Sequence, residues 1–148
     1  MGQESNTKSI NQADKKLVDL MHFGLDHGVE SIKIKGKGPL VPFVVIELNG
    51  EKELTRFLRD KPEDGVKDGI RSLKEAKESQ FAVLVHDGYL TVAGQKFNAV
   101  IAKGFDRNDT VGYSLAQRYS PKKFFSSFKS IGKPSFVGNA EQLLNKST

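Results

Sequence analysis

The sequence contains no cysteine and no tryptophan among its 148 residues. Without cysteine the chain forms no disulfide, and it offers no thiolate to zinc, to an iron–sulfur cluster or to a covalent intermediate. No apolar run approaches the ~18 residues that a membrane helix needs, which excludes a transmembrane helix and a membrane partner of that kind. The first six residues lack the pattern of a secretory signal peptide, so we expect a cytoplasmic protein.

The motifs of several common enzyme classes are missing as well. The chain has no G-x-G-x-x-G, no P-loop and no G-x-S-x-G nucleophile elbow. Residues 106–110 begin like an EF-hand calcium loop, but Val111 replaces the required glycine and Gln117 the required glutamate. The three histidines are scattered along the chain, and we predict no metal site, no cofactor and no catalytic residue. These absences favour a protein that is not an enzyme.

The positive charge is concentrated near the C-terminus. The chain holds 23 basic and 18 acidic side chains, a net charge of +5. Residues 106–148 carry seven of the basic side chains and three of the acidic ones, which leaves the first 105 residues nearly balanced. A basic segment of this kind is the one compositional indication of an anionic partner.

The hydrophobic pattern predicts a first helix over residues 12–27, with Gly28 ending it. Residues 31–40 alternate lysine with apolar side chains and predict a short edge strand or an extended loop. An apolar strand over 41–48 leads into Asn49-Gly50, which is the strongest short signal of a hairpin turn.

A second helix is predicted to begin at Pro62, because proline suits the first helical position. From residue 81 onward, short strands alternate with turn signals, which predicts an antiparallel meander. Asp87-Gly88 is interpreted as one of these turns, so the neighbouring His86 is not expected to form a catalytic pair with Asp87.

These elements predict a fold of the α+β class. We expect residues 1–10 to be a disordered lead-in and residues 11–148 to form a single domain. The domain should contain an antiparallel sheet of about five to seven strands, with two helices packed on one face.

Three functions are compatible with this reading. The first is a non-enzymatic binding or interaction module that forms a homodimer. The second is a nucleic-acid or anion binder that uses the basic, aromatic-rich C-terminal segment; its candidate residues are Arg118, Lys122, Lys123, Lys129 and Lys133. The third is a small enzyme or ligand-binding domain with a pocket near Arg118; its candidate residues are Tyr89, Gln117, Arg118 and Tyr119.

Three short segments carry a resemblance to known proteins: residues 39–43 (PLVPF), 87–89 (DGY) and 116–119 (AQRY). In their order and spacing, the stretch from Pro39 to Leu144 resembles small conserved hypothetical proteins of bacteria. The resemblance implies a compact bacterial protein of one domain. It implies no activity, and no functional residue is carried over from it.

Overall fold

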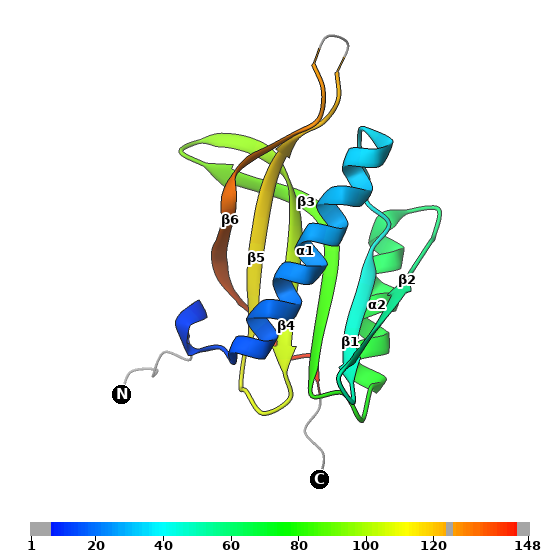
Figure 1. The fold of residues 1–148 in the computed structure, drawn as a ribbon, viewed down its shortest axis with the longest axis vertical. Coiled ribbons are helices and arrows are strands. Elements are labelled where there is room, and N and C mark those ends of the chain that lie inside the picture. Colours follow the sequence, from blue (N-terminus) through cyan, green and yellow to red (C-terminus); the bar gives the residue numbers. More distant parts are fainter. Residues whose placement is uncertain (1–6, 124–125, 145–148) are drawn as a thin grey trace.

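The computed structural model describes residues 7–123 and 126–144 (Figure 1). Within these residues, six strands form one antiparallel sheet in the order β2-β1-β3-β4-β5-β6. The predicted α+β class and antiparallel sheet are therefore confirmed. A 3-10 turn at Ile10–Gln12 precedes the first helix. The helices and strands are α1 (Lys15–Lys35), β1 (Phe43–Leu48), β2 (Glu51–Arg56), α2 (Pro62–Glu75), β3 (Phe81–Val92), β4 (Gln95–Asp106), β5 (Gly112–Ser120) and β6 (Lys129–Ala140).

Helix α1 extends two turns beyond its predicted end. Its N-terminus is capped by the Asp14 carboxylate, and it continues through Gly28 to Gly36, which adopts the left-handed conformation with φ of 87°. Gly28 lies inside the helix because the helix approaches the sheet closely there: a Cβ at this position would lie 3.0 Å from Val100. Residues 31–35 are thus helical and not extended. No helix in the described part of the chain is both long and apolar enough to cross a bilayer.

The two helices cover opposite faces of the sheet, and the prediction that both lie on one face was wrong. Side chains alternate between faces along a strand. In β3, Val83 and Val85 pack in the cluster that contains α1, whereas Leu84 packs in the cluster that contains Leu73 of α2. Figure 1 shows α1 in front of the sheet and α2 behind β1 and β2. Residues 81–85 are buried on both faces of the sheet, so they are all apolar and do not alternate with polar residues. This strand therefore gives no pattern from which to place the two helices on one face or on opposite faces.

The first hairpin and the start of α2 are as predicted. Asn49-Gly50 connects β1 to β2, and both residues have positive φ, 52° and 81°. The register places Glu47 opposite Lys52, a favourable cross-strand pair. Pro62 occupies the first turn of α2, where its missing N–H costs no hydrogen bond.

The turn predicted at Asp87-Gly88 is absent, and this prediction was wrong. Strand β3 runs without a break to Val92 and pairs with β4 along its whole length. The chain reverses at Ala93-Gly94, which have φ of 51° and 79°, and a turn at residues 93–96 is also predicted by the sequence. The Asp87 carboxylate is held by groups from other elements, as described below, and this keeps the dipeptide extended.

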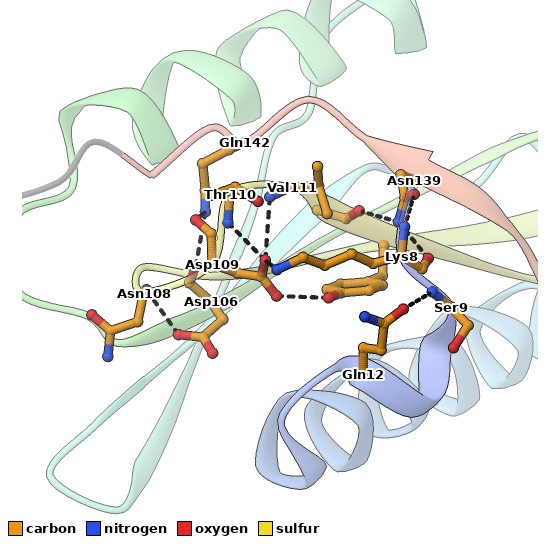
Figure 2. Close-up of polar contacts among 12 residues, drawn as sticks. Lys8, Ser9, Gln12, Asp106, Asn108, Asp109, Thr110, Val111, Asn139 and Gln142 are labelled. Atoms are coloured by element: carbon orange, nitrogen blue, oxygen red, sulfur yellow. Dashed lines mark hydrogen bonds and ion pairs between the residues drawn. The ribbon is translucent and has the colours of Figure 1, made fainter. Parts of the chain in front are cut away.

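The turn between β4 and β5 gathers donors around the buried carboxylate of Asp109 (Figure 2). This carboxylate accepts hydrogen bonds from Lys8 Nζ at 2.8 Å, Tyr113 Oη at 2.6 Å and the Thr110 N–H at 2.7 Å. Burial raises the pKa of Asp109, but the hydrogen bonds together outweigh it and hold this pKa below its usual value. Lys8 also exchanges two hydrogen bonds with Asn139 of β6, at 2.8 and 3.0 Å.

The remaining predictions concern the disordered lead-in at residues 1–10 and the homodimer. Of the predicted lead-in, residues 1–6 lie outside the described residues, whereas Lys8 is held by Asp109 and Asn139.

The sheet has β2 and β6 as its outer strands. Exposed charged side chains lie along β2, and charges on an edge strand discourage pairing with another copy. The homodimer stays a prediction.

Candidate ligand-binding pocket

A pocket of about 830 Å³ lies where β3 extends beyond its neighbour β1. The β1–β3 ladder ends at the pair Phe43 and Val85, so β3 from residue 86 onward pairs only with β4 within the described chain. The loop between α1 and β1 and the first turns of α2 border this stretch on the side where β1 no longer pairs with it. The pocket is lined by Lys37, Gly38, Pro39, Leu40, Pro42, Pro62, Glu63, Val66, Lys67, His86, Asp87, Gly88, Tyr89, Asn98, Tyr119 and Pro121.

The Asp87 carboxylate connects three parts of the pocket wall. It accepts hydrogen bonds from Tyr119 Oη of β5 at 2.8 Å, from the Leu40 N–H of the loop at 3.0 Å and from the Gly88 N–H at 3.1 Å. Each carboxylate oxygen therefore has at least one donor. Asp87 thus fixes the loop against the end of β3, and its position depends on contacts that are distant in the sequence.

Tyr119 acts as a permanent donor in this arrangement. Burial raises the pKa of the Tyr119 phenol, and its hydrogen bond to the negative Asp87 carboxylate raises it further. The phenol consequently remains protonated, and its proton is directed at Asp87. Asp87 and Tyr119 stabilise the pocket and do not present a free acid–base pair to a substrate.

His86 contributes an unused acceptor beside the pocket. Its Nδ1 lies 2.8 Å from the main-chain oxygen of Asp87, and because a carbonyl oxygen only accepts, Nδ1 carries the proton. The other nitrogen, Nε2, therefore has a lone pair; it is buried and has no hydrogen-bond partner within the described residues. Burial lowers the pKa of His86, an effect that its bond to Asp87 opposes and the charge of Lys103 reinforces.

The lowered pKa of His86 predicts that the protein loses stability in mildly acidic solution. The unfolded chain gains a proton at this histidine below about pH 6.5, whereas the folded protein does so only at lower pH. The free energy of unfolding should therefore fall as the pH drops from 7.5 to 5.5, by at most about 1.4 kcal/mol per pH unit for one group. Urea denaturation at pH 7.5, 6.5 and 5.5 measures this slope.

Two variants separate the contribution of His86 from that of other groups. His86→Gln removes the titrating ring and should reduce the slope without abolishing it. The remaining slope comes from His27, because burial and, to a smaller extent, the charge of Arg56 lower the pKa of His27 as well. His27→Gln should in turn leave the part of the slope that His86 supplies. A His86→Gln variant with the full slope would contradict the assignment.

The structure brings together two of the four predicted ligand-binding residues. Tyr89 and Tyr119 line the pocket, and Tyr89 is 63% exposed at its rim. Gln117 lies elsewhere: its amide donates to main-chain oxygens of Arg118, Ile131 and Gly132, at 3.0 to 3.1 Å. It borders a smaller pocket of about 240 Å³ between α1 and β6.

Arg118 is also outside the main pocket. Its guanidinium lies over the ring of Phe97, 4.7 Å from the ring centre, which is a cation–π contact. The other predicted basic residues are exposed and also lie outside the main pocket; they are Lys122, Lys123, Lys129 and Lys133.

Sequence reasoning missed most of the pocket wall. The loop of residues 37–42, the start of α2 and Asn98 of β4 come from three separate segments that have no shared motif. Pro39, Pro42 and Pro62 are evident in the sequence as signals of loops and of a helix start. Such signals do not indicate that these residues line the same pocket. Comparisons with protein-family models, with curated proteins and with solved structures found no match for this chain.

Proposed function

We propose that the protein is a non-enzymatic binding module whose pocket at the end of β3 receives a small, mostly apolar ligand. The observation that carries this proposal is the pocket itself. Its volume of about 830 Å³ lies within the range of about 300–1,000 Å³ that is typical of small-molecule sites. Its lining includes four prolines, one leucine, one valine and the rings of two tyrosines.

The polar groups of the pocket support binding and give little support to catalysis. The side chains of Asn98 and Tyr89 form no hydrogen bond within the described part of the chain, so the Asn98 amide and the Tyr89 hydroxyl can orient a ligand. The Tyr89 ring itself contacts Lys96, whose Nζ lies 4.0 Å from the ring centre. Asp87 and Tyr119 are occupied by each other. The Nε2 lone pair of His86 is covered in the free protein, and a ligand N–H or O–H would reach it only after the ring shifts.

The fluorescent probe 1-anilinonaphthalene-8-sulfonate tests the proposal, since its rings are apolar and it brightens in apolar sites. We expect saturable binding with one probe per chain. Tyr89→Ala removes an exposed aromatic wall and should weaken binding about fivefold, because an aromatic contact contributes about 0.5–1.5 kcal/mol. Val66→Trp, which places a large ring in the pocket, should abolish it.

Leu58→Ala is the matched control. Leu58 is 77% exposed, and it does not line the pocket. Its truncation should leave probe binding unchanged. If Val66→Trp folds, as its circular dichroism would show, and still binds the probe as the unmodified protein does, the pocket is not the binding site and the proposal fails.

A further inference from the structure

Two lysine-rich segments that are far apart in the sequence meet at the C-terminal end of α1. The N–H of Lys122, which follows β5, donates to the Gly36 carbonyl at 2.6 Å. The carbon atoms of the Lys122 side chain lie against Gly36 as well: a Cβ built there would be 3.2 Å from Lys122 Cδ. Figure 1 shows the β5–β6 hairpin passing this end of the helix and projecting beyond the sheet.

The contact gathers six exposed lysines, which we name the basic end. They are Lys33, Lys35, Lys37, Lys122, Lys123 and Lys129. Lys129 belongs to this group because it is paired with Ser120, the last residue of β5. Within residues 7–123 and 126–144, none of the six forms an ion pair. Their charges are thus available to a partner.

The distribution of charge along the chain makes this end distinctive. Residues 31–42 and 118–138 hold eight basic side chains and no acidic one. The rest of the chain carries 15 basic against 18 acidic side chains, a net charge of −3. The acidic groups near this end include Asp87, which is occupied by Tyr119 and Leu40, and Glu63, which lines the main pocket together with Lys37. Asp26 and Glu30 line the smaller pocket together with Ser130 and Pro134 of β6. A protein that is negative elsewhere therefore attracts polyanions through one end.

We propose that the basic end binds the phosphate backbone of a nucleic acid, without preference for its sequence. Lysines act on phosphates as point charges and do not read bases in the two-pronged manner of arginine. The candidate arginine, Arg118, is already placed over Phe97. An anionic membrane is the competing partner, and the measurement with vesicles below distinguishes it from a nucleic acid.

Fluorescence anisotropy with a labelled DNA duplex of random sequence tests the proposal. We expect binding at 50 mM salt that weakens steeply as salt is added, because phosphate contacts release counterions. The double variant Lys122→Ala, Lys123→Ala should bind on the order of a hundredfold more weakly at 50 mM salt. Its slope of log affinity against log salt should be smaller by about 1.8, which corresponds to two phosphate contacts.

The double variant Lys15→Ala, Lys16→Ala is the matched control. It removes the same charge from the other end of α1, about 30 Å away, where both side chains are also exposed. Its affinity and salt slope should equal those of the unmodified protein. Equal losses in both double variants would mean that only net charge matters, and would overturn the proposal. So would the absence of DNA binding at 50 mM salt, or tighter binding to vesicles of phosphatidylcholine and phosphatidylserine than to DNA.

Discussion

Replacing Asp109 by alanine is expected to lower the free energy of unfolding by about 3 kcal/mol. The substitution removes the acceptor of a hydroxyl group, an ammonium group and a main-chain N–H at once. Tyr113 is fully buried, and the change removes the acceptor of its hydroxyl group. A buried donor without a partner costs about 1–3 kcal/mol, and the loss of the Lys8 ion pair adds to this. Urea denaturation at pH 7 measures the effect.

Two further variants define the source of this effect. Asn108→Ala alters an exposed side chain in the same turn and should change stability by no more than about 0.5 kcal/mol. Tyr113→Phe removes the buried hydroxyl itself, so combining it with Asp109→Ala should cost less than the sum of the two single changes. If the two costs simply add, the hydroxyl is not what Asp109 stabilises.

Replacing Gly65 by alanine should destabilise the protein by about 2 kcal/mol, although alanine is the better helix former. Gly65 lies in α2 at the point where the helix crosses the chain after β2. A Cβ at this position would collide with the main-chain oxygen of Phe57 and would lie 3.1 Å from the Pro42 ring. The Phe57 N–H donates to the Pro42 carbonyl at 2.9 Å, so neither group can move freely. Thermal and urea denaturation measure the change.

Gly69→Ala provides the comparison within the same helix. Its Cβ would meet a methyl group of Leu84 at 2.9 Å, and a leucine side chain can rotate away where a carbonyl cannot. The gain in helix propensity should offset most of its cost, so we expect a change below about 1 kcal/mol. Equal costs at the two positions, or stabilisation by Gly65→Ala, would show that α2 tolerates a Cβ against Phe57.

Local signals in the sequence predicted the parts of the fold that depend on neighbouring residues. Asn49-Gly50 specifies its turn because both residues accept positive φ, and Pro62 specifies a helix start because it lacks an N–H. The end of α1 was missed because Gly28 serves packing against the sheet and not termination. The requirement for glycine at position 28 comes from contact with Val100, which lies 72 residues further along the chain. The residues around Gly28 in the sequence do not reveal this contact.

The candidate site was predictable only as separate residues. Tyr89 and Tyr119 were named as ligand-binding candidates, and both line the pocket. Asp87 was not named as a site residue, because Asp87-Gly88 was interpreted as a turn. In the structure its carboxylate binds Tyr119 and Leu40 and so connects the parts of the pocket wall. A dipeptide with strong turn propensity stays extended when its side chain bonds to distant groups. The pocket arises from where β1 ends relative to β3, which is a property of strand register and not of residue type.

The bonds between Lys8 and Asn139 have a consequence for the order in which the protein folds. These residues are 131 positions apart, and one belongs to the first described residues of the chain and the other to the last strand. Bringing together such distant segments costs chain entropy that local contacts do not. During synthesis, Lys8 therefore has no partner on β6 until Asn139 has left the ribosome. Docking of the segment that contains Lys8 depends on the strand that follows all the other described strands in the sequence.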